Sequence, residues 1–309
     1  MPSFAILGPG GVGGFVASVL VRAGTDVVVV GREHEVELIS RRGISVDSRR
    51  FGKFTGRPAA VTELTKPTDF LVVATKATTL SEALGRVKVE PRLGVPLLNG
   101  FEHMATLRSH FGNARVAAGV IRIEADCPAP GRVVHSSPSA LVELAANDPS
   151  QRDAVGELAN VFNRVDIPAT IGESELQVLW SKLVRFAPLA CTTSATDRPI
   201  GFVRSDRHWR SVLVAAISEV VAVANAEGAR IDQAVPLAEL EAAHPTLGSS
   251  MLRDLAAGRE PELDAIAGAV LRAAARHAIE CPTIAALAAV IAERANIPIP
   301  RIGSASMTG

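Results

Sequence analysis

The stretch Gly8-Pro9-Gly10-Gly11-Val12-Gly13-Gly14 decides the fold of this chain. It follows Phe4–Leu7, a short apolar run typical of a buried parallel strand, and it precedes residues 15–23, which are typical of a helix. A second apolar run, Val27–Val30, comes at the spacing of a strand–helix–strand unit. The context predicts a dinucleotide-binding turn, with a purely structural glycine turn as the alternative.

The glycines of this turn fit the pattern G-x-G-x-x-G, and each has a separate physical role. Gly8 permits the tight turn, Gly10 lets a pyrophosphate approach the backbone, and Gly13 lets the helix pack close to the strand. The helix N-terminus then offers N–H groups and a partial positive charge to the phosphates. The residues we predict to bind cofactor at this turn are Gly8, Gly10, Gly11, Val12 and Gly13.

Length and composition limit the class of protein. The chain has 309 residues, which favours about two domains, and its 48% hydrophobic and 21% charged residues allow a large core. Lys+Arg and Asp+Glu both number 32, so the formal net charge is zero and we expect neither nucleic acid nor a membrane as a partner. No apolar run approaches the roughly 20 residues of a membrane span.

The three cysteines, Cys127, Cys191 and Cys281, are widely spaced. They form neither a metal-ligand pattern nor an even set for disulfides, and we expect no metal site. This cysteine usage, together with the lack of a charged leader before the first strand, favours a cytoplasmic protein.

Short Val-rich runs alternate with helical segments up to about residue 170. This rhythm predicts an α/β fold, with a Rossmann-type domain over residues 1–172 in which helices cover a parallel sheet. Two apolar runs within 131–144 predict an added antiparallel hairpin at the sheet edge, and a short strand is expected near 165–171. The expected parallel strands are 4–7, 27–30, 70–74, 95–98 and 115–120.

The pattern changes near Gly172, where strand signals end and Ala-rich segments of helical period begin. These segments predict an all-α substrate domain over 173–309, with a loose tail at 298–309. Because open α/β sheets bind ligands beyond the carboxyl ends of their strands, we expect residues of both domains to contribute to the site. The expected helices are 173–195, 207–228, 234–243, 250–257, 262–278 and 283–294.

The end of the second strand bears on the choice of cofactor. An acid at this place binds the ribose 2′-OH of NAD, whereas an arginine suits the 2′-phosphate of NADP. Arg32 comes first after the strand and Glu33 follows it, so we predict NADP(H), with NAD through Glu33 or a solvated Arg32 as alternatives.

Two more strand ends carry polar residues. Lys76 follows Phe70–Ala74, where it can contact cofactor or a substrate carboxylate, or simply be a solvated loop lysine. Asn99 follows the next strand, and its amide can both donate and accept toward a nicotinamide or a substrate oxygen. The alternative for Asn99-Gly100 is a plain turn.

The helical domain contains a second set of candidates. Lys182, Phe186 and Ala190 are spaced to form one helical stripe, and a lysine at the head of an apolar stripe is partly desolvated, which suits acid–base chemistry. An ordinary lysine whose ammonium reaches water is the alternative. Ser250 and Glu262 stand at positions where they can cap the helices that follow.

Taken together and in this order, the motifs resemble the ketopantoate reductase family, the NADPH-dependent 2-dehydropantoate 2-reductases. The resemblance covers nearly the whole chain. It rests on the glycine-rich turn, Lys76, Asn99-Gly100, Trp180-x-Lys182-Leu183, and Ser249-Ser250-Met251 with Glu262 and Asp264.

The resemblance implies a role for each candidate. Lys182 would be the catalytic lysine and Glu262 the partner acid that holds substrate and lysine, while Ser250 would contact the substrate. Asn99 and Lys76 would line the site for both cofactor and substrate, and Arg32 would meet the 2′-phosphate of NADPH. The resemblance also implies a C-terminal domain like that of the 6-phosphogluconate dehydrogenase superfamily, and a homodimer is left open.

One departure from the family pattern concerns the substrate. The family carries asparagines one and two turns after the catalytic lysine, where this chain has Phe186 and Ala190, with Pro188 between them. The expected function is NADPH-dependent reduction of a 2-oxo acid, with 2-dehydropantoate (to pantoate, for pantothenate biosynthesis) as the first candidate. The alternatives are a bulkier or more apolar 2-oxo acid and an NADP-binding regulatory protein that has lost catalysis.

Overall fold

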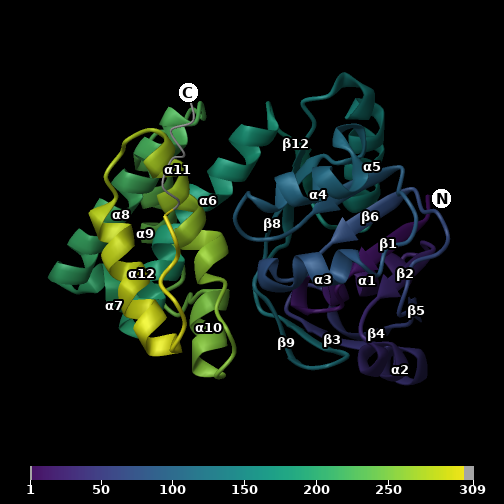
Figure 1. Ribbon diagram of the computed structural model, residues 1–309. Helices are drawn as coiled ribbons and strands as arrows, with labels where there is room; N and C mark the ends of the chain where they lie inside the picture. The colour runs from purple at the N-terminus through teal and green to yellow at the C-terminus, as the bar shows by residue number, and fades with distance from the viewer. Residues whose placement is uncertain (1, 303–309) are drawn as a thin grey trace. The chain divides into compact units, whose positions relative to one another are not determined.

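The computed structural model describes residues 2–302, and Figure 1 shows its path from purple at the N-terminus to yellow at the C-terminus. The chain forms two compact units. The first unit comprises the chain up to Leu98 together with Glu102–Val178, and the second comprises Asn99–Phe101 together with the chain from Leu179 onward. Most of the tail predicted to be loose, residues 303–309, lies outside the described residues.

The first unit is built on a parallel sheet with strand order β5-β2-β1-β6-β7. Phe4 pairs with Val27 on one side and with Phe70 on the other, and β1 and β6 are buried along their whole length. Strands covered on both faces are continuously apolar, which is why the Val-rich runs located them correctly. The strands are β1 (Phe4–Leu7), β2 (Val27–Val30), β5 (Ala59–Val61), β6 (Phe70–Val73) and β7 (Leu93–Pro96).

Helices and short turns connect these strands. The first helix, α1, begins at Gly11 rather than near residue 15, so the glycine-rich stretch forms both the turn and the first helical turn. The α-helices of this unit are α1 (Gly11–Arg22), α2 (Glu33–Arg42), α3 (Leu80–Leu84), α4 (His103–Phe111) and α5 (Arg152–Arg164). The 3-10 turns are η1 (Ala77–Thr79), η2 (Asn113–Arg115) and η3 (Pro149–Gln151).

Two smaller sheets complete the first unit, and they correct the predicted hairpin at 131–144. One has the order β4-β3-β10-β9 and the other β12-β11-β8, so β10 and β11 lie in different sheets. β10 pairs in parallel with β3, and parallel pairing between distant segments has no local sequence signal. The strands are β3 (Ile44–Ser48), β4 (Gly52–Gly56), β8 (Ala118–Arg122), β9 (Ala125–Ala129), β10 (Arg132–His135), β11 (Leu141–Ala145) and β12 (Ala169–Ile171).

The second unit is helical, as predicted. Its long helix α6 begins in the first unit, where the Arg108 guanidinium pairs with the buried Glu175 carboxylate at 2.5 Å. The region predicted as one helix over 262–278 contains a π-helical turn, and the short helix α7 was not predicted. The elements are α6 (Glu175–Thr196), α7 (Ile200–Ser205), α8 (Arg207–Ala226), α9 (Ala234–Ala242), α10 (Ser250–Ala256), η4 (Asp264–Gly268), α11 (Ala269–Arg276) and α12 (Pro282–Ala295).

Glu219 explains a polar break in the apolar helix α8. Its two carboxylate oxygens accept hydrogen bonds from the backbone N–H groups of Thr283 and Ile284, at 2.8 and 2.9 Å. These N–H groups belong to the first turn of α12, where helices have unpaired donors. By length and composition α8 is the one described helix that could cross a membrane, a property that apolar core helices share. Within the second unit, Glu219 of α8 has a structural role, since its carboxylate caps the N-terminus of α12.

Candidate functional site

The geometry of the glycine turn fits a bound dinucleotide. Gly8 has φ +93°, a conformation that favours glycine, and a Cβ on Gly13 would lie 2.0 Å from the Gly8 carbonyl oxygen. A Cβ on Gly10 would instead have no heavy atom of the described chain within 4 Å. Gly13 is therefore required for packing, whereas Gly10 leaves open space beside the backbone that a diphosphate can enter.

Two further glycines of the stretch have a packing role that the sequence did not reveal. A Cβ on Gly11 would lie 2.6 Å from the carbonyl oxygen of Ala125, and one on Gly14 would lie 2.9 Å from Cγ2 of Val133. These contacts bring β9 and β10 directly onto the first turn of α1. No side chain among the described residues caps this helix at Gly10, which leaves its N-terminus suited to an anion.

Lys76 lies next to the carboxyl end of β6 and close to the glycine turn. A Cβ on Gly8 would lie 2.9 Å from Cγ2 of Thr75, the residue before Lys76. Lys76 is half-buried and is the N-cap of η1. The buried hydroxyl oxygen of Thr75 has no hydrogen-bond partner among the described residues, and no sequence pattern had pointed to this residue. This edge of the sheet therefore has a cation and a polar group beside the turn.

Arg32 is the N-cap of α2, directly after β2. Its backbone N–H donates to Oε2 of Glu35 at 2.7 Å, and its side chain, about half exposed, lies 3.7 Å from the Glu82 carboxylate. An ion pair that exposed contributes little, so the guanidinium can turn to a ligand at small cost. Glu33 is exposed in the first turn of the same helix.

In the second unit, Asn99 and Glu262 contact each other directly. The Asn99 amide donates to Oε2 of Glu262 at 2.9 Å, and Glu262 is only 7% exposed. The next residue, Gly100, has φ +77°, and a Cβ there would lie 2.2 Å from the carbonyl oxygen of Ala265 in the π-helical turn. The turn expected as an alternative at Asn99-Gly100 therefore also holds the Asn99 amide against the buried Glu262 carboxylate.

Lys182 and Phe186 lie side by side on α6, one turn apart. The Lys182 ammonium is 5.8 Å from the centre of the Phe186 ring, and both residues are half-buried. A cation near an aromatic face gains about 0.5–2 kcal/mol, depending on how far it is desolvated. Ala190, which the spacing places on the same stripe, is fully buried, so it is not exposed beside Lys182 and Phe186. The packing around α6 at this point, two turns beyond Lys182, covers the Ala190 side chain.

Ser249, and not Ser250, caps α10. Ser249 is extended (φ −111°, ψ 163°), and its hydroxyl accepts a hydrogen bond from the N–H of Leu252 at 3.0 Å. Ser250 is the first helical residue, half-buried, and its hydroxyl makes no hydrogen bond to a described residue. Glu262 precedes the helical segment rather than lying within it, and its carbonyl accepts from Ile266. Because Ser249 caps α10, the hydroxyl of Ser250 is not used for capping.

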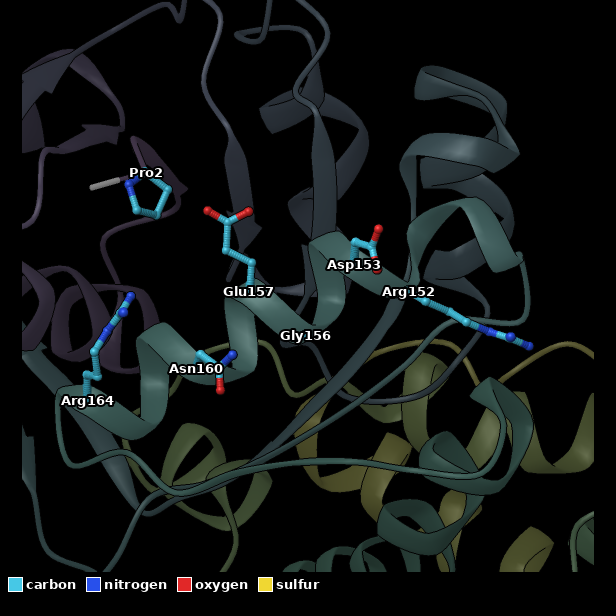
Figure 2. Close-up of a pocket in the computed structure, with 7 residues that line it drawn as sticks. All are labelled: Pro2, Arg152, Asp153, Gly156, Glu157, Asn160 and Arg164. Carbon is cyan, nitrogen blue, oxygen red and sulfur yellow. The ribbon is translucent and has the colours of Figure 1, made fainter.

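A surface hollow on the first unit contains none of the candidate residues. Figure 2 shows that most of its lining comes from α5, including Asp153, Glu157 and Arg164, with Pro2 opposite. The lining carries two arginines and two acids, a mixture of charges typical of a solvated helix face rather than of a ligand site. Among residues 2–302 no cluster of three or more His, Cys, Asp or Glu side chains could hold a metal ion.

Comparison with known proteins assigns the family. The profile described as ketopantoate reductase PanE/ApbA matches residues 4–148, and that described as ketopantoate reductase PanE/ApbA C terminal matches residues 176–295. The chain belongs to the ketopantoate reductase family. Members are NAD(P)-dependent oxidoreductases, and the parallel sheet followed by a helical domain is the fold of this family.

Several relatives match over nearly the full chain. A 2-dehydropantoate 2-reductase of Caulobacter vibrioides is 29% identical, covering 94% of this chain and 98% of that protein. An uncharacterized oxidoreductase of Bacillus subtilis, YkpB, is 25% identical over 91% of this chain and 95% of that protein.

Solved structures agree on the fold. The 2-dehydropantoate 2-reductase of Geobacter metallireducens has a TM-score of 0.87 and 26% identity, covering 94% of this chain and 99% of its own. A D-mandelate dehydrogenase with NADH and anilino(oxo)acetate has a TM-score of 0.88 at 19% identity, covering 96% and 100%. This second likeness concerns the fold alone.

Proposed function

We propose that this oxidoreductase reduces a 2-oxo acid to the 2-hydroxy acid with NADPH, and that 2-dehydropantoate is its first candidate substrate. The observation that carries the proposal is the buried Glu262 carboxylate held by Asn99, in a family member that also retains Lys182. The family match covers both parts of the chain, and the relative from Caulobacter is a 2-dehydropantoate 2-reductase.

The proposed reaction assigns one task to each residue. A nicotinamide cofactor supplies a hydride to the carbonyl carbon. Lys182 donates a hydrogen bond to the carbonyl oxygen, stabilises the negative charge that develops there and delivers the proton, so that C=O becomes C–OH. Glu262 accepts from Asn99 and orients Lys182 and a substrate hydroxyl, while Ser250 hydrogen-bonds the substrate.

The test is turnover of a panel of 2-oxo acids, followed by the loss of the nicotinamide absorbance. Lys182→Met should lower kcat by roughly 10²–10⁴-fold, the range for a lost general acid. It should leave cofactor binding nearly unchanged. Lys88→Met is the control, because Lys88 pairs with Glu63 on the exposed surface. Near-normal turnover by Lys182→Met would refute the assignment and make Lys76 the next candidate.

The cofactor preference rests on Arg32. A charge-assisted hydrogen bond to a phosphate contributes about 1.5–3 kcal/mol, so NADPH should bind more tightly than NADH and Arg32→Ala should reduce that difference. Fluorescence titration with both cofactors measures it. Equal affinities in the unmodified protein would instead assign the ribose to Glu33 and the enzyme to NAD.

Phe186 favours a second candidate, a bulkier or more apolar 2-oxo acid. An aromatic ring beside Lys182 offers apolar surface where the family pattern has an amide. The D-mandelate dehydrogenase of similar fold was solved with anilino(oxo)acetate, an aryl-bearing ligand. The substrate panel decides between the two candidates through kcat/KM, and tight NADPH binding without any turnover would favour the regulatory alternative.

We also propose a cytoplasmic enzyme whose partners are its small-molecule ligands, with a homodimer as the assembly to test. The zero formal net charge and the three free cysteines support this placement. Light scattering coupled to size exclusion measures the assembly directly.

A further inference from the structure

Two adjacent threonines on α6 differ in a single respect. Thr192 and Thr193 are both fully buried, and each hydroxyl donates to the carbonyl oxygen four residues earlier, on Pro188 and Leu189, at 2.7 Å in both cases. Such bonds are a common way for a helix to satisfy a buried threonine and imply no function. Only Thr193 reaches a different element, because its Oγ1 lies 3.1 Å from Oγ of Ser249.

The direction of these hydrogen bonds follows from the number of hydrogens available. Thr193 gives its one hydroxyl hydrogen to Leu189, so toward Ser249 it acts as the acceptor. Ser249 therefore donates to Thr193 while its own oxygen accepts from the N–H of Leu252. The result is a continuous line of donors and acceptors from the start of α10 to the backbone of α6. Ser249 is only 2% exposed, so water does not replace these bonds.

This line fixes the residue that follows Ser249. Ser250 begins α10, and its hydroxyl makes no hydrogen bond to a described residue, so the orientation of this side chain depends on how the helix start is held. Thr193 lies about three turns beyond Lys182 on α6, which returns it to the same side of the helix. One helix thus carries the candidate catalytic lysine and, further along, the support for the candidate substrate serine.

We propose that Thr193 is a positioning residue, which acts through Ser249 to hold Ser250 toward a polar group of the 2-oxo acid. The inference rests on the proposed function, in which Ser250 contacts the substrate. Thr193 itself touches neither substrate nor cofactor. Its loss should affect substrate binding more than the chemical step.

The experiment compares Thr193→Val with Thr192→Val. Both variants keep the size of the side chain and remove a buried hydroxyl, but only Thr193→Val breaks the line to Ser249. One neutral hydrogen bond corresponds to about 0.5–1.5 kcal/mol, so KM for the 2-oxo acid should rise about three- to tenfold in Thr193→Val. Its kcat and cofactor Kd should stay within about twofold, Thr192→Val should keep the KM of the unmodified protein, and Thr193→Ser should restore it.

A second background separates positioning from general damage. In Ser250→Ala, Thr193→Val should add no further increase in KM, because the group it positions is gone. The proposal is overturned if the two valine variants raise KM equally, if Thr193→Ser fails to restore it, or if the effects of Thr193→Val and Ser250→Ala add.

Amide exchange makes failure of this proposal distinguishable from failure of the proposed function. Exchange at the Leu252 N–H should be faster in Thr193→Val than in Thr192→Val, whether or not any substrate is turned over. If the unmodified protein reduces no 2-oxo acid, the proposed function fails. Faster exchange at the Leu252 N–H in Thr193→Val would still show that Thr193 holds the start of α10 through Ser249. Unchanged exchange at Leu252 overturns the structural part of the proposal.

Discussion

The side-chain amide of Asn99 donates a 2.9 Å hydrogen bond to Glu262, a residue 163 positions later in the chain. Glu262 is almost fully buried, and a buried carboxylate is costly unless donors satisfy it. Gly100, packed against the carbonyl of Ala265, holds the amide in place. The contact therefore stabilises the structure and also holds Glu262, the acid proposed to orient Lys182 and the substrate.

Asn99→Asp should damage this pair without changing its size. The new carboxylate faces that of Glu262, so at neutral pH we expect repulsion where there was a hydrogen bond to a charged group, and a loss of about 10- to 100-fold in kcat/KM. Asn160→Asp, on the exposed face of α5, is the control. Turnover within twofold of the unmodified protein would mean that Asn99 does not support the site.

Gly10→Ala should weaken cofactor binding while leaving the fold intact. Gly10 has φ −75°, which alanine adopts easily, and its Cβ would enter open space, so the melting temperature should barely change. Binding of NADPH should weaken at least tenfold because the methyl group occupies the approach to the backbone, and titration measures this. The control is Gly156→Ala in α5, which also has open space and should stabilise the protein by about 0.5–1 kcal/mol. Unchanged NADPH affinity in Gly10→Ala would remove the turn from the cofactor site.

Phe186 should make the enzyme indifferent to a hydroxyl on the substrate. Since the ring beside Lys182 offers no hydrogen bond, we expect kcat/KM for 2-dehydropantoate and for an analogue without its hydroxyl to lie within about tenfold. Phe186→Asn should shift the ratio toward the hydroxylated acid. A preference of about a thousandfold or more in the unmodified protein would show that other residues replace the missing amides.

The buried ring of His135 is held in one neutral tautomer. Ser48 accepts N–H groups of Arg50 and Phe51 and so gives its hydrogen to Nδ1, at 2.8 Å. Nε2 then donates to the Ser137 hydroxyl at 3.0 Å, because the hydrogen of the Ser137 hydroxyl is already donated to the carbonyl oxygen of Ser139. Desolvation by burial lowers the pKa of His135 below its ordinary value of 6.5. Protonation would place a hydrogen between two donors.

Stability should therefore fall as the pH falls below about 6.5. The unfolded chain takes up a proton at His135 near that pH, whereas the folded protein resists it until its lower pKa is reached, so the stabilisation is complete above 6.5 and is lost on acidification. Urea unfolding of the unmodified protein and of His135→Asn should give free energies that converge between pH 7 and pH 5. His208→Asn, at an exposed ring, should leave the pH dependence unaltered. A constant gap between unmodified protein and His135→Asn would contradict this explanation.

Glu219→Gln should destabilise the second unit by about 1–2 kcal/mol, because a neutral amide offers one acceptor where the carboxylate offers two for the N–H groups that begin α12. Thermal unfolding measures the loss. Glu280→Gln, an exposed position shortly before α12, should change stability by less than about 0.5 kcal/mol. If both substitutions cost the same, the cap is not the cause.

The sequence predicted four strands of the parallel sheet because they are apolar and buried, but it missed the more exposed edge strand β5, and the run expected at 115–120 falls in β8, which pairs antiparallel with β11 in another sheet. The runs Val27–Val30 and Phe70–Val73 are apolar throughout, and the helices between them show the expected period. The hairpin expected at 131–144 was wrong because β10 pairs with β9 just before it and with the distant β3, whereas β11 pairs with β8 and β12 in another sheet. Ladders of this kind depend on tertiary packing, which local periodicity does not encode.

The candidate site was predictable where its contacts are local. The proximity of Lys182 and Phe186 follows from helical spacing alone. The contacts of Asn99 with Glu262 and of Thr193 with Ser249 join segments far apart in the sequence, and no pattern marks them. Ser249 and Ser250 are chemically identical neighbours, and only the backbone angles decide which of them caps α10.

The three residues Asn99–Phe101 also impose an order on synthesis. They leave the ribosome long before Leu179 and the helices that follow, although they belong to the unit those helices build. At a translation rate of about 5–20 residues per second, Asn99 waits roughly 10–30 s for Glu262, which lies 163 residues downstream. The first unit can fold early, but the second unit must wait, although its segment Asn99–Phe101 has already been synthesised. A fragment that begins at Leu179 would therefore keep the buried acid and lack the amide that satisfies it.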